Sequence, residues 1–302
     1  MDIARSYLQR TSNLLQARTY DLIWLEYEAF PWVPYSIERL LCSFASRVPY
    51  VVDYDDAVFH RYDQHVSRLV RLGLGEKIDR VMERAAVVIA GNDYLAIRAK
   101  EAGAKKIVIL PTVLDLERYP DGSSPQNSVF TIGWVGTPQT SHYLETVREA
   151  LKHVCADRNG RVSIVGARNV DLGDVPYEIR PWSLETEVQE ISGFDVGIMP
   201  LPDSPWERGK CGHKLIKYMA CSLPVVASPV GVNGTIVEHG TNGFLARTTD
   251  DWIRALTTLR EDPALRIKMG RAGRLKVERM YNTSVTAPRL AALLREASKG
   301  HH

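Results

Sequence analysis

The sequence predicts an α/β protein made of two units, each an open parallel sheet covered by helices. Short runs rich in Val and Ile alternate with longer amphipathic segments. The runs are apolar at consecutive positions, which is typical of parallel strands buried on both faces. One polar, turn-rich segment at 121–128 interrupts this pattern, and a new apolar run follows it directly. We therefore expect a domain boundary at that segment.

The apolar runs follow one another along the chain at spacings that leave room for helices between them. As predicted strands they lie at 20–26, 49–55, 86–91, 107–111, 129–135, 162–166, 195–201, 224–228 and 243–246. Helical periodicity fills most of the gaps, for example at 143–156 and 212–221. The chain opens with a helix-like segment at 1–17, and an amphipathic helix is predicted at 284–297.

This pattern predicts an N-terminal α/β domain at 1–120, a linker at 121–128 and a C-terminal α/β domain at 129–282. Residues 283–302 are expected to form a final helix and tail, which pack either on the N-terminal domain or on their own domain. Parallel sheets bind ligands at the carboxyl ends of their strands. Two such units facing each other would form a cleft for a small molecule.

The composition of the 302 residues narrows the class of protein. Hydrophobic residues make up 45% and charged residues 25%, as in ordinary globular proteins. The formal net charge of +2 is too small to favour nucleic acid as the main partner. The four cysteines, Cys42, Cys155, Cys211 and Cys221, form no CxxC pair, which favours free thiols in a reducing compartment.

The hydropathy of the sequence favours a cytoplasmic protein. The N-terminus lacks the apolar core of a signal peptide, and no apolar run approaches the roughly 18 residues that span a bilayer. The weakly basic balance is compatible with a peripheral place at the inner membrane surface.

The most informative motif is a basic turn that contains two glycines, at 208–214, ahead of a short amphipathic helix. The N-terminus of a helix presents backbone N–H groups and a partial positive charge, which together bind anions. Arg208, Lys210 and Lys214 add cationic side chains, so the motif predicts a phosphate or diphosphate site. The alternative is a solvated stripe, because Lys210, Lys214 and Lys217 recur at helical spacing.

Several further motifs resemble those of the retaining glycosyltransferases of family 4, also called group 1. The matching pieces, besides 209–227, are 52–57, 90–92, 110–119, 132–138, 194–201, 229–233 and 242–246. The resemblance implies the GT-B architecture of two Rossmann-like domains. It also implies transfer of a sugar, with hexosyl-type transfer expected, from a nucleotide-diphosphate donor to a hydroxyl of a glycan or lipid-linked acceptor. Retained anomeric configuration, a role in polysaccharide biosynthesis and no bound metal or cofactor follow from the same resemblance.

The sequence departs from the family at three places. Gly209 and Lys217 stand where the family usually has two glutamates, the second of which accepts hydrogen bonds from the donor ribose. Lys217 carries donors only and cannot do the same. The turn at 134–140 has no cation where the family often supplies Arg and Lys. Finally, the N-terminal domain looks short by several elements. Either the sequence is a truncated form, or the protein is naturally minimal and a partner subunit or a second copy completes the domain.

The predicted site residues follow from these motifs and from their places at strand ends. The predicted catalytic residues are Asp56, His60 and Lys210. The donor diphosphate is expected at Gly136, Thr137, Arg208, Gly209, Lys210, Cys211, Gly212, His213 and Lys214. The donor nucleoside is expected at Trp182, Ser183 and Lys217, and the sugar or acceptor at Asp55, Asn92, Asp203, Trp206 and Glu207.

Each of these predictions has a structural alternative. Asp55 and Asp56 also suit capping of a strand-end turn, His60 a structural role, and Asn92 the N-cap of the following helix. Trp182 suits ordinary packing. Glu207 is the nearest carboxylate that could stand in for the missing first glutamate.

Two other functions fit the same sequence. A non-catalytic or partner-dependent GT-B protein that binds nucleotide would explain the altered glutamate positions. A nucleotide-sugar epimerase would use a similar fold, and it would be separated from a transferase by its product.

Overall fold

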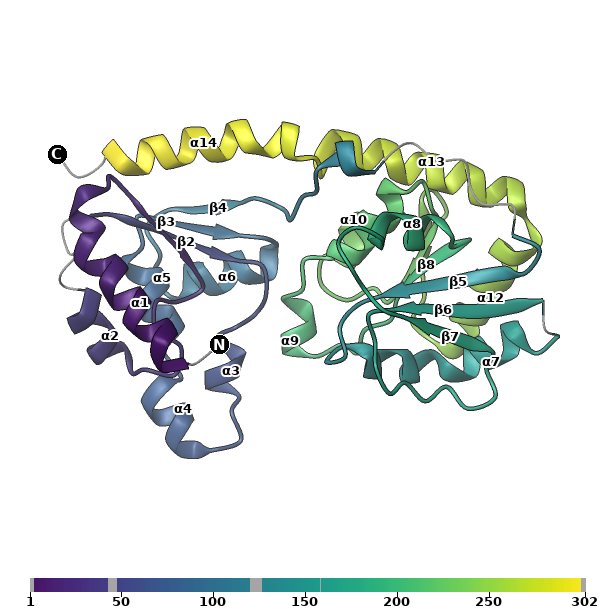
Figure 1. The fold of residues 1–302 in the computed structure, drawn as a ribbon, viewed down its shortest axis with the longest axis horizontal. Coiled ribbons are helices and arrows are strands. Elements are labelled where there is room, and N and C mark those ends of the chain that lie inside the picture. Colours follow the sequence, from purple (N-terminus) through teal and green to yellow (C-terminus); the bar gives the residue numbers. More distant parts are fainter. Residues whose placement is uncertain (1–2, 43–47, 120–126, 158, 300–302) are drawn as a thin grey trace. The chain divides into compact units, whose positions relative to one another are not determined.

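The computed structural model describes residues 3–42, 48–119, 127–157 and 159–299. The chain divides into two compact units (Figure 1). Unit 1 comprises Met1–Pro111, Arg208–Cys211 and Ala287–His302, and unit 2 comprises Thr112–Glu207 and Gly212–Thr286. The division thus falls earlier than the predicted linker, of which residues 121–126 lie outside the described residues. The basic turn was not expected to join the N-terminal unit.

Unit 1 is built on a four-stranded parallel sheet in the order β1-β2-β3-β4. Its strands are β1 (Ile23–Glu26), β2 (Tyr50–Tyr54), β3 (Val87–Ala90) and β4 (Ile107–Ile109). Its helices are α1 (Ile3–Gln16), η1 (Ala17–Thr19), α2 (Tyr35–Cys42), α3 (His60–Asp63), α4 (Arg68–Leu74), α5 (Lys77–Arg84) and α6 (Asp93–Glu101). The fully buried β3 is a run of Val and Ile, as expected for a strand covered on both faces.

The C-terminal helix α14 (Thr283–Lys299) crosses from unit 2 into unit 1 along the chain. Leu293 and Ala297 pack with Val51, Val87 and Ile89, which project from one face of the sheet of unit 1. From residue 287 onward this helix therefore packs on the N-terminal unit, one of the two places expected for it.

Unit 2 is built on a six-stranded parallel sheet in the order β10-β9-β8-β5-β6-β7. Its strands are β5 (Phe130–Val135), β6 (Gly160–Val165), β7 (Tyr177–Arg180), β8 (Val196–Met199), β9 (Val225–Ala227) and β10 (Gly243–Leu245). Helical segments connect them: η3 (Leu116–Arg118), η4 (Ser141–Val147), α7 (Arg148–Cys155), α8 (Glu187–Ser192), α9 (Pro205–Arg208), α10 (His213–Ala220), α11 (Asn233–Ile236), α12 (Thr249–Glu261) and α13 (Pro263–Met280).

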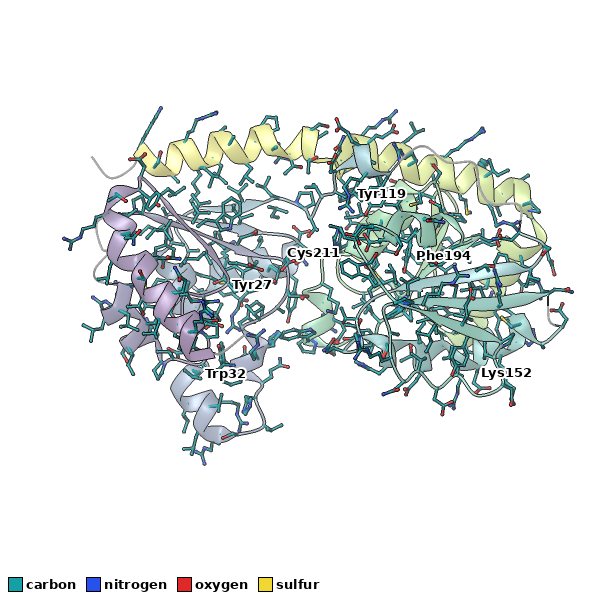
Figure 2. The ribbon with its side chains drawn as sticks, in the orientation of Figure 1. Tyr27, Trp32, Tyr119, Lys152, Phe194 and Cys211 are labelled. Carbon is teal, nitrogen blue, oxygen red and sulfur yellow. The ribbon has the colours of Figure 1, made fainter. Side chains whose placement is uncertain are left out.

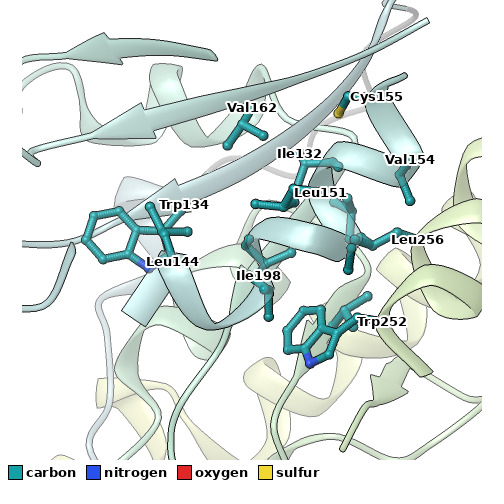
Figure 3. Packing of buried hydrophobic residues seen from close by; sticks show 14 of the residues in the cluster. Ile132, Trp134, Leu144, Leu151, Val154, Cys155, Val162, Ile198, Trp252 and Leu256 are labelled. Atoms are coloured by element: carbon teal, nitrogen blue, oxygen red, sulfur yellow. The ribbon is translucent and has the colours of Figure 1, made fainter. Parts of the chain in front are cut away.

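Two apolar clusters hold the sheet of unit 2 between its helices. On one face, Trp134 and Ile198 pack against Leu151 of α7 and against Trp252 and Leu256 of α12 (Figure 3). On the other face, α10 lies between the sheet and α13. Among the described helices, none is both long enough and apolar enough to cross a membrane.

Candidate functional site

In unit 2, two turns at the carboxyl ends of neighbouring strands pack backbone against backbone. Gly136 follows β5 and Gly166 follows β6, and the Gly136 amide donates to the Val165 carbonyl at 3.0 Å. Gly166 has a φ of 85°, and a Cβ at this position would lie 2.3 Å from the Gly136 carbonyl oxygen. Only glycine fits there, because both the conformation and the close approach exclude a side chain.

Lys214 brings a positive charge to the Gly136 turn. Its Nζ lies 4.0 Å from the centroid of the Trp134 ring, a cation–π contact. A Cβ placed on Gly136 would lie 2.7 Å from the same Nζ. Lys214, in the first turn of α10, thus supplies a positive charge to the turn at 134–140, which has no cation of its own. This position differs from the solvated stripe that the sequence left open.

The helix that carries Lys214 begins at a glycine in the left-handed conformation. Gly212 has a φ of 68°, and a Cβ there would lie 2.3 Å from Ile236 Cδ1. The residue that starts α10 is therefore fixed as glycine by packing as well as by conformation. The macrodipole of α10 adds about half a positive charge at this end.

Lys217, one turn further along α10, pairs with a carboxylate that the sequence analysis did not single out. Lys217 Nζ lies 2.6 Å from Glu187 Oε1, and Trp182 Nε1 donates to the same oxygen at 2.7 Å. The Tyr119 hydroxyl donates to Oε2 at 3.3 Å. Glu187 is buried. A carboxylate thus lies on α8, beside the position 217 at which the family usually has a glutamate. The sequence signal for this carboxylate is Lys217 itself, a lysine whose neighbours on the helix are mostly apolar.

These contacts set the charge of Glu187. Burial acts to raise the pKa of this carboxyl, but the hydrogen bonds from Lys217 and Trp182 outweigh it and hold the pKa below its ordinary value. The Glu187 carboxyl is therefore ionised at neutral pH. The Trp182 indole is 49% exposed and is oriented by the same carboxylate.

The remaining predicted residues of unit 2 make local contacts. The Thr186 amide donates to Ser183 Oγ at 3.2 Å, and the Thr137 amide donates to Thr140 Oγ1 at 3.3 Å. Ser183 thus turns the chain into α8, and Thr137 closes the turn after Gly136.

Glu207 lies buried in α9 with both carboxylate oxygens engaged. One oxygen accepts from the Tyr143 hydroxyl and the other from the Ser204 hydroxyl. Its neighbour Trp206 is half-buried, and Asp203 is exposed. The carboxylate proposed as a stand-in for the first family glutamate is thus held by its own unit.

In unit 1, the basic turn 208–211 packs on the end of β2 and on the start of α6. A Cβ on Gly209 would lie 2.4 Å from Ala57 Cβ, which explains glycine at a position where the family has glutamate. Asn92 Nδ2 donates to the Gly209 carbonyl at 2.9 Å and to the Lys210 carbonyl at 3.2 Å. Asn92 Oδ1 accepts from the Leu95 amide at 3.0 Å and caps α6.

Asn92 is buried and caps α6, as the structural alternative predicted. Its hydrogen bonds to two carbonyls also hold the basic turn in unit 1. Both the nitrogen and the oxygen of its side-chain amide are engaged in these hydrogen bonds. Cys211, on the same turn, accepts from Asn92 Nδ2 at 3.4 Å (Figure 2).

Acidic residues line the same end of the sheet of unit 1. Lys210 Nζ lies 3.5 Å from Asp56 Oδ1, and the Tyr27 hydroxyl donates to Asp55. Burial, with the charges of Asp55 and Glu26 adding to it, raises the pKa of Asp53 to about 6. Among the described residues, no group of three or more His, Cys, Asp or Glu side chains is placed to hold a metal ion.

His60 is held at both ring nitrogens. Nδ1 lies 2.8 Å from Asp63 Oδ1, and Nε2 lies 2.8 Å from the Tyr94 hydroxyl. The side chain is 8% exposed. The histidine predicted as catalytic is thus one member of a fixed polar cluster in unit 1.

The structure divides the predicted diphosphate set. The residues from Arg208 to Cys211 belong to unit 1, whereas Gly212, His213 and Lys214 belong to unit 2 with Gly136 and Thr137. The predicted nucleoside residues Trp182 and Lys217 meet through Glu187, also in unit 2.

The comparisons with known proteins concern the same regions. Residues 129–262 match the family described as "Glycosyl transferases group 1". A D-inositol 3-phosphate glycosyltransferase of Pseudarthrobacter chlorophenolicus is 29% identical over 112 residues, which cover 36% of this chain. The match spans about a quarter, 26%, of that protein's length.

Solved structures resemble most of the chain. Sucrose-phosphate synthase from Thermosynechococcus elongatus has a TM-score of 0.73 at 20% identity, over 92% of this chain and 74% of that one. Anabaena Alr3699/HepE in complex with UDP and glucose has a TM-score of 0.73 at 18% identity, over 94% and 80%. S. aureus TarM has a TM-score of 0.71 at 13% identity, over 94% and 57%.

Together with the two parallel sheets, these likenesses define a GT-B fold, as the sequence predicts. Within this fold, residues 129–262 are the part of the chain that resembles the group 1 glycosyltransferases.

Proposed function

We propose that the chain is a retaining glycosyltransferase that moves a sugar, of hexosyl type, from a nucleotide-diphosphate donor to a hydroxyl of a glycan or lipid-linked acceptor. The observation that carries the proposal is Lys214, whose ammonium lies at the Gly136 turn in the segment that matches the family. The Alr3699/HepE structures, in complex with UDP and with UDP-glucose, make UDP the first donor nucleotide to test.

In this proposal unit 2 binds the donor. The bond between the anomeric carbon and the diphosphate breaks, and negative charge develops on the departing nucleotide diphosphate. Lys214 and the N-terminus of α10 stabilise that charge, because both are fixed in place before the reaction. The Gly136 and Gly166 turns let the diphosphate approach the backbone closely.

We propose that this chain donates hydrogen bonds to the nucleoside where the family accepts them. In the family a glutamate accepts from the ribose hydroxyls, whereas here Lys217 would donate to the ribose oxygens. Glu187 takes one of the three N–H donors of the ammonium and fixes its direction. The exposed face of Trp182, oriented by the same carboxylate, would pack against the base.

The proposed acceptor side lies in unit 1, where Asp56, His60 and Lys210 are the catalytic candidates. Asp56 and Lys210 form an ion pair. In this proposal the acceptor oxygen bonds to the anomeric carbon as the diphosphate leaves, and the Asp56 carboxylate takes the proton of the acceptor hydroxyl. We assign Asn92 a positioning role, since it holds the basic turn through two carbonyls.

We also propose that Lys214 and α10 supply the positive charge for the leaving group without a divalent cation. Turnover is then expected to be the same before and after dialysis against EDTA. Activity that is lost with EDTA and restored by Mg²⁺ or Mn²⁺ would contradict this.

The test of the donor site is a thermal-shift panel with UDP, GDP, ADP, dTDP and CDP. A nucleotide at about 100 times its dissociation constant adds roughly 2.7 kcal/mol of stability to a folded protein. We expect one nucleotide, UDP first, to raise the Tm of the wild type and to raise that of Lys214→Ala much less. Lys152→Ala, an exposed lysine of the same unit, is the control.

Product analysis then separates the possible functions. Release of the nucleotide diphosphate with sugar on the acceptor supports the transferase, whereas an isomeric nucleotide-sugar would identify an epimerase. No stabilisation by any nucleotide would contradict the proposed donor site.

A further inference from the structure

The loop between β1 and α2, residues 27–34, contains two strained residues. Tyr27 and Trp32 both have a φ of 64°, in the left-handed region that side chains other than glycine rarely adopt. Such conformations persist only where the surrounding structure enforces them, and they gather at binding and catalytic sites. We call this segment the Trp32 loop, and the contacts around it hold both residues in this conformation.

A buried ion cluster fixes the backbone of the Trp32 loop. Lys77 Nζ lies 2.6 Å from Glu28 Oε2 and 2.8 Å from Glu38 Oε2, and the Lys77 side chain is 0% exposed. The Glu38 carboxylate accepts from the Ala29 amide at 3.3 Å and from the Phe30 amide at 3.2 Å. A charge of the loop itself, Glu28, thus meets charges from α2 and α5.

The same cluster reaches Trp32 through Tyr62. The Tyr62 hydroxyl donates to Glu28 Oε1 at 2.7 Å and accepts from the Trp32 amide at 3.0 Å. The rings of Tyr62 and His65 make edge contacts with the indole, with centroids 5.2 Å and 5.7 Å from that of Trp32. The indole is nevertheless 49% exposed.

A loop with a purely structural role does not need a buried ion cluster, because burying the charges costs free energy. Removing three charged groups from water is unfavourable, and apolar side chains of similar volume often stabilise a fold at least as well. What the ion cluster adds is one defined conformation of the loop, and what that conformation presents is a flat aromatic surface in a fixed orientation.

The Trp32 loop also joins the strand-end acids of unit 1. The Tyr27 hydroxyl donates to Asp55, at the end of the neighbouring parallel strand β2 (Figure 2). The carboxyl ends of parallel strands meet at one edge of a sheet, where ligands bind. One loop therefore carries an exposed indole and, through Tyr27, contacts a carboxylate at this edge.

We infer that the Trp32 loop recognises the acceptor, and that the acceptor presents a pyranose sugar. A pyranose has an apolar C–H face that an indole covers, and it has hydroxyls that donate to a carboxylate such as Asp55. A purely aliphatic lipid would match the ring but would offer no hydrogen-bond donor to the carboxylate. The inference rests on the proposed transferase function, because it names the substrate that receives the sugar.

The test uses an array of immobilised pyranose oligosaccharides and the full chain. We expect the wild type to bind at least one pyranoside, and Trp32→Asn to bind it at least tenfold more weakly. Asparagine tolerates the left-handed conformation, so the Tm of Trp32→Asn should not fall. Trp32→Phe should keep most of the binding. Trp24→Asn, which removes an exposed tryptophan of the same unit, should bind like the wild type.

Donor measurements separate this inference from the proposed function. Nucleotide-induced thermal shifts and hydrolysis of the nucleotide-sugar in water should be equal in the wild type and in Trp32→Asn. Unchanged glycan binding by Trp32→Asn would overturn the inference, and so would transfer to an aliphatic alcohol with no binding to any pyranoside. Pyranoside binding that depends on Trp32, without any response to nucleotides, would instead refute the transferase and leave a carbohydrate-binding protein.

Discussion

At the scale of single residues, the structure pairs Lys217 with a carboxylate from another helix. The family carries a glutamate where this chain has Lys217, and Glu187 on α8 lies within 2.6 Å of the ammonium. The carboxylate is buried and the lysine side chain is 17% exposed. Removing one partner of such a pair leaves the other charge poorly solvated, which costs more than the pair itself contributes.

Glu187→Gln is therefore expected to lower stability by about 2 kcal/mol at pH 7. Because the pKa of Glu187 is lowered in the folded protein, the stabilisation is present above the ordinary pKa of a glutamate and is lost as pH falls. The difference between variant and wild type should thus shrink toward pH 3. Urea denaturation at both pH values measures it, and Glu187→Gln/Lys217→Gln, which leaves no unpaired charge, should recover part of the loss.

Asp53 predicts a pH dependence of the opposite sign. Burial first, and then the neighbouring acids, raise its folded pKa to about 6 from an ordinary 3.8. The folded state binds the proton more tightly than the unfolded chain, so stability is greatest below about pH 4, where Asp53 is protonated in both states, and falls as pH rises through about 6.

Asp53→Asn should accordingly be more stable than the wild type at pH 7.5 and equal to it at pH 3.5. Since the side chain is half-buried, we expect about 1 kcal/mol rather than the full value of the pKa shift. Thermal unfolding at the two pH values measures the difference, with the exposed Asp250→Asn as control. A gain of equal size at both pH values would show that the charge of Asp53 is not responsible.

At the scale of elements, the basic turn 208–211 is shaped by close packing in unit 1. Gly209 leaves no room for a side chain beside Ala57, and Asn92 holds two carbonyls of the turn. A change that lifts this turn would displace Lys210 from Asp56 without altering either charged group.

Gly209→Ala should therefore lower turnover by at least tenfold while folding remains intact. The double variant Ala57→Gly/Gly209→Ala should recover only part of the activity, because the backbone of residue 57 is also within 3.1 Å of the added Cβ. Gly234→Ala is the matched control, since no atom lies within 4 Å of its Cβ. Wild-type turnover in Gly209→Ala would mean that the position of this turn is not important for catalysis.

The elements also show what a sequence can predict. Strands such as β3, β5 and β8 are apolar at nearly every position and are buried throughout, so their runs were recognised. The edge strand β7 alternates between exposed and half-buried residues and was not among the predicted runs.

The candidate site divides in the same way. The basic turn and the first turn of α10 are local and were recognised from spacing. Asn92 and Gly209, by contrast, are 117 positions apart, and Lys217 and Glu187 are 30 apart. Spacing along a chain does not encode which elements meet, so Glu187 and the packing of Gly209 on Ala57 required the fold.

At the scale of the whole molecule, the chain is two units with separate cores. The clusters that pack around β5 and β8 belong to unit 2, whereas Leu293 and Ala297 of α14 complete a cluster of unit 1. The last helix therefore contributes its burial to the N-terminal unit. Disturbing that contact should affect one unit and spare the other, because stability is local where cores are separate.

Leu293→Ser tests this division. The substitution removes a buried leucine and places a hydroxyl among Val51, Val87 and Ile89, which should cost about 3 kcal/mol. Hydrogen exchange should quicken in β2 and β3 of unit 1 and remain unchanged in β5 and β8 of unit 2. Ala292→Ser, at an exposed position of the same helix, is the control. Equal loss of protection in both sheets would mean that the two units unfold as one cooperative body, and the nucleotide-induced thermal shift would then report on the whole chain rather than on unit 2.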